Sequence, residues 1–200
     1  MSHLQWFNEK AAIWDNIATE QTRQRLWQII QSLNIAPGSR ILDVATGTGI
    51  LIPWLMAAAG PTGQVTAIDF APRMIEEAQK KHPGGVLLLV ADVHNLPFAD
   101  QSFDEVVCNS AFPHFAHQAR AMGEMARVLV TGGRLTICHP APREELNDFH
   151  RRLGGVVGND MLPDATAMQE MARASGLERV SIADGPETYL FTAFRPAPAL

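Results

Sequence analysis

The stretch that decides the fold reads Arg40-Ile41-Leu42-Asp43-Val44-Ala45-Thr46-Gly47-Thr48-Gly49, and an apolar run over residues 50–59 follows it. Its aliphatic residues predict a buried strand beside an acid, and the apolar run predicts a helix. The two glycines in the turn between them let the backbone approach a ligand closely. The start of the helix offers unpaired N–H groups and the positive end of a dipole. We therefore predict a site for a small, nucleotide-like cofactor.

Composition indicates a globular protein that binds small molecules. The 200 residues are 46% hydrophobic and 18% charged, which is close to ordinary globular values and excludes a disordered chain. The net charge of −5, without a block of like charges, argues against a nucleic-acid partner. No apolar stretch approaches the ~20 residues of a membrane helix, and the first residues lack a signal-peptide pattern. We expect a cytoplasmic protein without stable membrane insertion.

Two helices are predicted before the first strand. Apolar residues three to four positions apart form one stripe over residues 4–17 and a second stripe over residues 20–33. Pro37-Gly38 lies in the segment that ends the second helix. The aromatic residues Phe7 and Trp14 of the first stripe either pack between helices or lie over the cofactor, and both interpretations stay open.

Strand and helix patterns then alternate along the chain. Strands are predicted over residues 64–69, 86–90, 103–109 and 134–138, and the aliphatic strand 86–90 is expected to be buried on both faces. Helices are predicted over residues 71–82 and 118–130, with a turn at Gly132-Gly133. Two strands, 177–183 and 188–194, flank the hairpin signal Asp184-Gly185-Pro186. The predicted fold class is α/β, with a mostly parallel sheet of seven strands, helices on both faces and an antiparallel C-terminal strand.

Polar side chains follow several predicted strands, namely Asp43, Asp69, Asp92 and Asn109. Ligands bind outside the carboxyl ends of parallel strands, and acids are costly to bury without donors, so these residues point to one site. Asp69 is placed to accept both hydroxyl protons of a ribose, and its alternative role is to cap the next helix. Asp92 is placed to accept from an amine such as that of adenine, and its alternative is a solvated loop acid.

The turn does not fit a pyrophosphate. A dinucleotide fingerprint would place a third glycine at position 52, where this chain has Ile52. Asp43 also brings negative charge to the place where a pyrophosphate would lie. The acid instead favours a cofactor that carries a cation or an amino group.

These segments together resemble the class I S-adenosylmethionine-dependent methyltransferases, and the quinone C-methyltransferases among them are the most similar branch. The resemblance covers residues 40–137 and rests on an ordered series of motifs: residues 42–49, Ile68-Asp69 with Met74 and Ala78, Ala91-Asp92-Val93, Leu96-Pro97-Phe98, Ser102-Phe103-Asp104 and residues 127–135. It implies a Rossmann-like fold, S-adenosyl-L-methionine as cofactor and S-adenosyl-L-homocysteine as product.

The resemblance also implies roles for single residues. The loop residues Ala45, Thr46, Gly47, Thr48 and Gly49 would pack on the methionine part of the cofactor, with Asn109 beside it. Asp69 would hold the ribose, Asp92 and the Val93 N–H would bind adenine, and Phe70 and Met74 would flank its ring. Two departures from the family pattern are Thr131 before Gly132-Gly133 and Ala45 in place of a glycine. Because Ala45 carries a β-carbon, we expect a negative φ there.

Methyl transfer needs an in-line approach, exclusion of water and, for some acceptors, a base. His114 and His139 are the candidate catalytic residues because they follow the fourth and fifth strands at the expected open edge of the sheet. His117 and His150 rank below them, and each histidine has packing or capping as its alternative. A metal site built from His139, Glu144 or Glu145, and His150 is a weaker hypothesis, since their spacing matches no metal motif, and we predict no metal.

The chain is expected to form a single domain with N-terminal helices over residues 1–39, a cofactor-binding core over 40–139 and a substrate-side insertion with the C-terminal hairpin over 140–200. The glycine-rich segment 154–163 is either a lid or a flexible connection. We predict methyl transfer to a small-molecule acceptor by in-line displacement. The alternatives are a nicotinamide-dependent oxidoreductase and a sensor or scaffold that binds the cofactor without catalysis. The acceptor is not determined, and a homodimer stays open.

Overall fold

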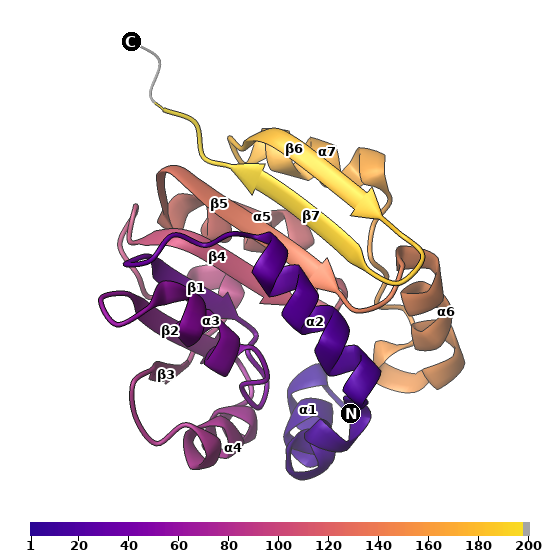
Figure 1. The fold of residues 1–200 in the computed structure, drawn as a ribbon. Helices are drawn as coiled ribbons and strands as arrows, with labels where there is room; N and C mark the ends of the chain where they lie inside the picture. Colours follow the sequence, from indigo (N-terminus) through magenta and orange to yellow (C-terminus); the bar gives the residue numbers. More distant parts are fainter. Residues whose placement is uncertain (198–200) are drawn as a thin grey trace.

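A sheet of seven strands organises the computed structural model, which describes residues 1–197 (Figure 1). The strands are ordered β3-β2-β1-β4-β5-β7-β6. Their bounds are β1 Arg40–Val44, β2 Gln64–Asp69, β3 Leu87–Val90, β4 Phe103–Asn109, β5 Leu129–His139, β6 Glu178–Asp184 and β7 Tyr189–Phe194. Strands β1 to β5 pair in parallel, and β7 is antiparallel to β5 and to β6. The predicted α/β fold with an antiparallel C-terminal strand is therefore confirmed.

Helices flank the sheet and close its carboxyl edge. The α-helices are α1 His3–Lys10, α2 Glu20–Ser32, α3 Ile52–Ala59, α4 Pro72–Lys81, α5 Gln118–Val128, α6 Arg143–Leu153 and α7 Ala165–Ala174, and the 3-10 helices are η1 Ala11–Ile17, η2 Val93–Asn95, η3 Phe112–His114 and η4 Gly155–Val157. Side chains of Ser2, Thr19 and Asp164 accept backbone N–H groups at the starts of α1, α2 and α7. These caps fix where the three helices begin.

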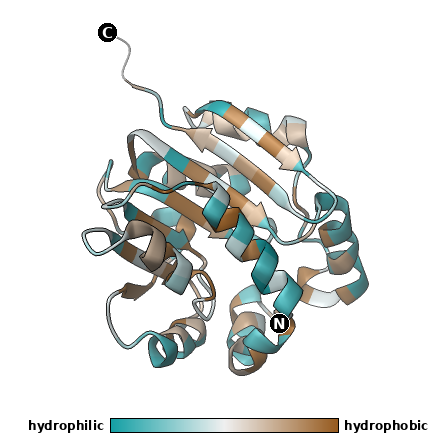
Figure 2. Ribbon diagram, viewed as in Figure 1, coloured by the Kyte–Doolittle hydropathy of each residue, from teal (hydrophilic) through white to brown (hydrophobic). Residues whose placement is uncertain are grey.

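The core lies on both faces of the sheet because side chains alternate along each strand. Ile41 of β1 packs with α2 and α3 on one face, together with Val107 of β4. The neighbouring residues Leu42 and Val106 pack with α5 and α7 on the other face. Figure 2 shows the hydrophobic bands that this alternation gives the central strands. Two apolar layers therefore hold the carboxyl ends of β1, β2 and β4 in fixed positions.

The N-terminal segment is two elements rather than one. A single helix over residues 4–17 is predicted, whereas α1 ends at Lys10 and the tighter η1 continues to Ile17. Phe7 and Ala11 pack against Met74 of α4. These tertiary contacts override the local helical pattern, and together α1 and η1 form what we call the cap.

The prediction that strand 86–90 is buried on both faces is wrong. Strand β3 lies at the edge of the sheet, and Leu87 and Val90 are 54% and 53% exposed. An unbroken aliphatic run is typical of a buried strand, but the order of strands in the sheet is a long-range property that such a run does not encode.

The predicted turn at Gly132-Gly133 is also wrong, because these residues belong to β5. Phe103 pairs with Leu129 and Glu105 pairs with Arg134, so the register shifts and the extra residues of β5 bulge outward. The bulge is held by Arg195, whose backbone bonds Gly132 and Gly133. Helix α5 accordingly ends at Val128 rather than at residue 130.

Candidate active site

A cavity of about 300 Å³ lies where the carboxyl ends of β1, β2 and β4 meet the cap. Parallel sheets bind ligands at this edge, and the volume is at the lower end of the ~300–1,000 Å³ of small-molecule sites. Of the residues predicted to bind the cofactor, the cavity is lined by Asp43, Ala45, Thr46, Gly47, Asp69, Phe70, Met74, Asp92, Val93 and Asn109. Other lining residues include His3, Phe7, Trp14, Ser110, His114 and Phe115.

Two buried carboxylates face this cavity. Asp43 accepts a hydrogen bond of 2.7 Å from the Thr46 hydroxyl, and Asp69 accepts backbone N–H groups from Gly47 at 2.9 Å and Ala71 at 2.8 Å. The side chains of Asp43 and Asp69 belong to residues that are only 1% and 6% exposed. The N-cap of α4 is Ala71, without a side-chain cap, so Asp69 bonds the residue that precedes the helix and does not cap the helix as its alternative role required. Asp69 also lines the cavity.

The charge of these carboxylates is not neutralised by the protein. Burial, with a smaller contribution from the nearby charge of Asp69, raises the pKa of Asp43 to about 7 against the hydrogen bond from Thr46. Burial raises the pKa of Asp69 to about 6 against the N–H bonds that it accepts. No salt bridge to either group occurs among residues 1–197. The cavity therefore favours a ligand that brings positive charge and hydrogen-bond donors.

The loop after β1 alternates between ordinary and left-handed backbone. The φ values of Ala45, Gly47 and Gly49 are 56°, 57° and 87°. The expectation of a negative φ at Ala45 is therefore wrong, and this residue bears the strain that a glycine would avoid. Thr46 fixes the turn, since its N–H donates to the carbonyl of Ile68 at 2.8 Å.

Thr48 and Gly49 lie outside the cavity lining, although they were predicted to pack on the cofactor. The Thr48 hydroxyl donates to Asp15 of η1 at 2.5 Å, and Asp15 forms a salt bridge with Lys81 of α4. A ring nitrogen of His82 lies 3.1 Å from the carbonyl oxygen of Gly49. Thr48 and Gly49 thus connect the loop after β1 to the cap and to the C-terminal end of α4.

The residues predicted to surround adenine lie at the mouth of the cavity. Asp92 is exposed and accepts from the backbone N–H of His94 at 2.9 Å. Burial alone would raise the pKa of Asp92, but the hydrogen bonds from His94 outweigh burial and lower the pKa. Phe70 is 38% exposed, whereas Met74 is 1% exposed. The Asp92 carboxylate, the partly exposed ring of Phe70 and the sulfur of Met74 therefore line one part of the cavity.

The cap supplies aromatic residues to the roof of the cavity. Phe7 packs edge-on against Phe70 and Trp14, with ring centroids 5.8 Å and 5.5 Å apart. Phe7 and Trp14 pack against each other and also line the cavity, so the packing interpretation is confirmed and their place over the cofactor stays a prediction. Sequence reasoning missed His3, whose contribution depends on a contact 157 residues away with Asp160. No local pattern signals such a contact.

His114 is the predicted catalytic residue that lines the cavity. Its Nδ1 lies 2.7 Å from Oδ2 of Asp160, and its ring packs against Phe7 with centroids 5.2 Å apart. The Nε2 atom of His114 makes no hydrogen bond within the described residues, and it is not among the fully buried polar atoms that lack a partner. His114 therefore has a ring nitrogen without a hydrogen bond in the cavity that the two carboxylates also line.

Comparison with known proteins agrees with this geometry. A methyltransferase-domain family model matches residues 42–137. The ubiquinone/menaquinone biosynthesis C-methyltransferase UbiE of Bordetella avium is 33% identical over 87% of this chain and 79% of its own length. This chain belongs to the class I S-adenosylmethionine-dependent methyltransferases. The demethylmenaquinone methyltransferase of Thermus thermophilus is 43% identical over 56% of this chain and 51% of that protein.

Solved structures share the fold of this methyltransferase. An S-adenosylmethionine-dependent methyltransferase from Aquifex aeolicus superposes with a TM-score of 0.75 at 20% identity, covering 92% of this chain and 98% of that one. The methyltransferase in a complex with the Haloferax volcanii Trm112 activator superposes with a TM-score of 0.79 at 20% identity, covering 96% and 98%. The predicted enzyme class and Rossmann-like fold are therefore confirmed.

The residues at the cavity fit S-adenosylmethionine, the cofactor of the family. The orphaned negative charge of Asp43 and Asp69 matches a molecule with a sulfonium, an amino group and a ribose diol. Each carboxylate retains oxygen lone pairs beyond its protein hydrogen bonds. A dinucleotide would instead bring a pyrophosphate to these acids, which disfavours the nicotinamide alternative.

His139, the second predicted catalytic residue, does not line the cavity. The expectation that it lies at the open edge is wrong, because β7 returns beside β5 and pairs Tyr189 with His139, which is fully buried. Both ring nitrogens lack a partner among the described residues. Burial, with smaller contributions from the charges of His114 and His150, lowers the pKa of His139 to about 3.

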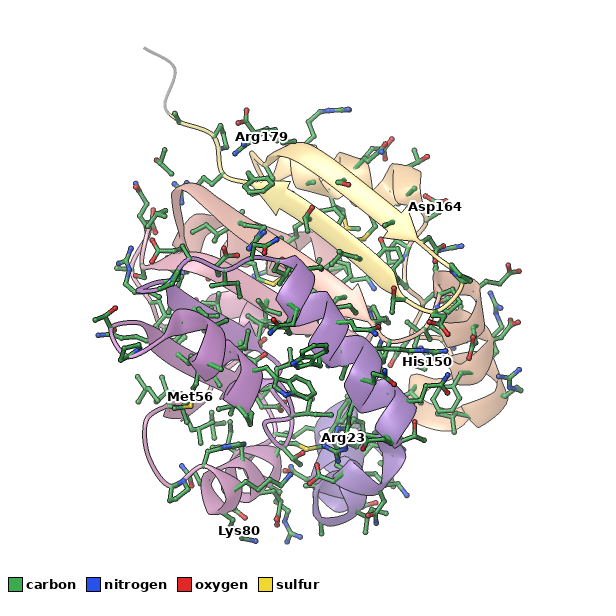
Figure 3. All side chains as sticks on the ribbon, in the orientation of Figure 1. Arg23, Met56, Lys80, His150, Asp164 and Arg179 are labelled. Carbon is green, nitrogen blue, oxygen red and sulfur yellow. The ribbon has the colours of Figure 1, made fainter. Side chains whose placement is uncertain are left out.

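The hypothesis of a metal-assisted acceptor site finds no support in the geometry. Within residues 1–197, no three His, Cys, Asp or Glu side chains are grouped to hold a metal ion. His150 projects from α6 into the molecule (Figure 3), where its Nδ1 bonds the carbonyl oxygen of Asp160 at 2.5 Å. His117 lies at the start of α5 and is exposed.

Within residues 1–197, no helix has the length and apolar character to span a membrane.

Proposed function

We propose that this methyltransferase transfers the methyl group to a ring carbon of a quinol-type aromatic acceptor. Two relatives named as quinone-pathway methyltransferases support this acceptor class, and one of them is named as a C-methyltransferase. The lining supports it as well, since Phe7, Phe70 and Phe115 give the cavity aromatic surface for a planar ring. The observation that carries the proposal is that His114 faces the same cavity as Asp43 and Asp69.

The proposed cofactor site follows the strand ends. Asp69 holds the ribose hydroxyls, and Asp43 stabilises the amino group or the sulfonium charge. Asp92 and the Val93 N–H bind adenine between Phe70 and Met74, while Asn109 and the loop over residues 45–47 adjoin the methionine part. Residues 40–139 thus form the cofactor-binding core, and residues 1–39 and 140–200 contribute the cap and the acceptor side of the same domain.

S-adenosylmethionine, when bound, supplies a methyl group on a positively charged sulfur. The chain's own task is to orient the acceptor, exclude water and accept a proton. The Nε2 lone pair of His114 accepts the proton of an acceptor hydroxyl, which raises electron density at the neighbouring ring carbon. That carbon would supply the electron pair of the new C–C bond, while the pair of the broken C–S bond would stay on the sulfur of the cofactor. The proton of the ring carbon would then be lost to solvent as the aromatic ring is restored, and His114 would return its proton to the acceptor oxygen. The cap covers the reacting region, because Phe7 and Trp14 line its roof.

The direct test is product analysis with isotopically labelled methyl donor. We expect methylation at carbon of short-chain benzoquinols and naphthoquinols, detected by mass spectrometry and by the carbon shift of the new methyl group. Amine and catechol acceptors serve as the comparison panel. Transfer only to nitrogen or oxygen would refute the ring-carbon acceptor, and cofactor binding without turnover on any acceptor would support the sensor or scaffold alternative.

The cofactor site has its own test in Asp69→Ala. We expect this substitution to weaken S-adenosylhomocysteine binding by ~1 kcal/mol or more in calorimetry, because charge-assisted hydrogen bonds are lost. Asp148→Ala, at an exposed ion pair on α6, is the control and should bind normally. Binding of NADH by the unmodified protein in place of S-adenosylhomocysteine would contradict the cofactor assignment.

A further inference from the structure

Asp160 joins three parts of the molecule that are far apart in sequence. It lies in the segment between η4 and α7, and its Oδ2 contacts Nε2 of His3 at 2.8 Å and Nδ1 of His114 at 2.7 Å. Its backbone carbonyl accepts from Nδ1 of His150 on α6. One residue of the glycine-rich segment thus contacts the cap, the loop after β4 and α6.

The carboxyl of Asp160 is ionised when it makes these contacts. Burial alone would raise the pKa of Asp160, but the hydrogen bonds from His114 and His3 outweigh burial and lower it. An ionised carboxylate has no proton to donate, so each ring nitrogen facing Oδ2 must be an N–H donor. Neutral His114 therefore carries its proton on Nδ1 and has the lone pair on Nε2.

We propose that Asp160 is a positioning residue for His114, which it holds in the Nδ1-protonated tautomer so that Nε2 accepts the acceptor's proton. The inference rests on the proposed function, because it assigns the group that prepares the proposed base. A carboxylate behind the histidine also stabilises the imidazolium that forms once the proton is taken. Asp160 touches neither acceptor nor cofactor in this role.

The other titratable groups around His114 are consistent with this arrangement. His150 packs against its ring with centroids 4.9 Å apart, and burial lowers the pKa of His150, so that ring is neutral near pH 7. The deeply buried His139 is neutral as well. His3 shares Oδ2 from the cap side. Asp160 is therefore the charged partner in direct contact with His114 within residues 1–197.

The first experiment reads the tautomer by nitrogen NMR of ring-labelled histidine in the full chain. We expect His114 to show a protonated Nδ1 and a lone-pair Nε2 near pH 7.5. In Asp160→Asn the amide can donate an N–H to Nδ1 as well as accept from it, so we expect the Nε2-protonated tautomer of His114 to appear. A proton on Nε2 in the unmodified protein, or an unchanged tautomer in Asp160→Asn, overturns the proposal without any need to know the acceptor.

The second experiment measures kcat and KM against pH with the best acceptor of the panel. For Asp160→Asn we expect kcat to fall about ten- to hundredfold with little change in cofactor KM, since a base contributes ~10²–10⁴-fold and its positioning only a part of that. The pH profile should change as well, because the base is no longer held in one tautomer. Asp160→Glu should recover part of both changes, and Asp148→Asn should leave rate and profile unchanged. Equal rates and profiles in Asp160→Asn would refute the positioning role.

Failure of the inference and failure of the proposed function give different results. If His114→Asn retains full rate, then the proposed base is wrong. If His114→Asn is slow but Asp160→Asn keeps the normal rate, profile and tautomer, the base stands and the positioning role falls. If Asp160→Asn does not fold, Asp160→Glu takes its place. The tautomer of His114 in the unmodified protein also tests the proposal, and that measurement needs no substitution.

Discussion

The indole Nε1 of Trp14 lies 3.4 Å from the position that a β-carbon on Gly47 would occupy. The cap therefore rests on the loop after β1 at a residue whose φ of 57° already favours glycine. Gly47 thus meets two demands at once, since it provides left-handed backbone and lets an aromatic ring come close.

Replacing Gly47 by alanine should disturb both the loop and the cap. A β-carbon in left-handed backbone costs ~1–2 kcal/mol, and the new methyl would lie in van der Waals contact with the Trp14 indole. We expect Gly47→Ala to lower the free energy of unfolding by ~1 kcal/mol and to weaken S-adenosylhomocysteine binding. Urea unfolding and calorimetry measure the two effects, and normal values for both would show that the loop adapts without strain.

The opposite change at Ala45 should stabilise the protein. Ala45 has a φ of 56°, so Ala45→Gly relieves ~1–2 kcal/mol of strain while it adds ~0.5–1 kcal/mol of backbone entropy to the unfolded chain. The expected net gain is ~0.5 kcal/mol in urea unfolding. Ala36→Gly, in a loop at ordinary φ, is the control and should be neutral or destabilising; a loss at Ala45 of the same size as the control would contradict this account.

Cofactor binding should release protons. The pKa values of Asp43 and Asp69 lie near 7 and 6 in the cofactor-free protein, and a cationic ligand favours the ionised forms. The affinity for S-adenosylmethionine should therefore rise as the pH increases from 5 to 8. Calorimetry at pH 6 in buffers of different ionisation enthalpy measures the number of protons released, and a heat independent of the buffer would count against buried acids that ionise on binding.

Asp43→Asn should separate stability from binding. The folded pKa of Asp43 is raised above its unfolded value, so the folded state binds more protons and loses stability as the pH rises from about 4 to about 7. We expect the cofactor-free variant to gain ~1 kcal/mol or more over the unmodified protein at pH 8 and nothing at pH 4, while its cofactor affinity falls. Asp104→Asn should instead lose stability at pH 8. Burial alone would raise the pKa of Asp104, but the hydrogen bonds from Arg40 outweigh burial and lower it.

Asn147 should be the critical residue of the segment before α7. Its side chain is 3% exposed, accepts the Leu162 N–H at 2.8 Å and donates to the Leu162 carbonyl at 3.1 Å. Asn147→Ala leaves the buried Leu162 N–H without a partner, while the Leu162 carbonyl keeps its hydrogen bond from Arg143 Nε, and we expect a loss of ~1–3 kcal/mol. Asn147→Gln is the matched variant and should lose less. Thermal unfolding measures both, and an alanine variant with unchanged melting temperature would show that water replaces the amide.

Much of the fold follows from local patterns. Strands β2 and β4 have the predicted bounds, because the alternation of apolar runs with turn residues is encoded within a few positions. Asp43 and Asp69, at the ends of β1 and β2, were predicted to share a site because the carboxyl ends of parallel strands lie at one edge of the sheet. The edge position of β3 and the burial of His139 depend on strand order, which no window of sequence contains.

The acceptor side of the site was harder to predict. The pair His114 and Asp160 is separated by 46 residues, and Asp160 lies among glycines where no periodicity exists. His3 joins the same carboxylate from the other end of the chain. These contacts arise only after the cap and the segment before α7 fold onto the sheet edge, so local propensity carries no trace of them.

The place of β7 has a consequence for how the molecule is made. β7 follows β6 along the chain, yet it is inserted between β5 and β6, and its Tyr189 covers His139. During synthesis the first five strands emerge in the order that lets them pair, whereas β6 has no strand to pair with until β7 follows it. The growing chain can therefore assemble the cofactor half of the sheet early, and it completes the wall behind the histidines only after β7 has emerged.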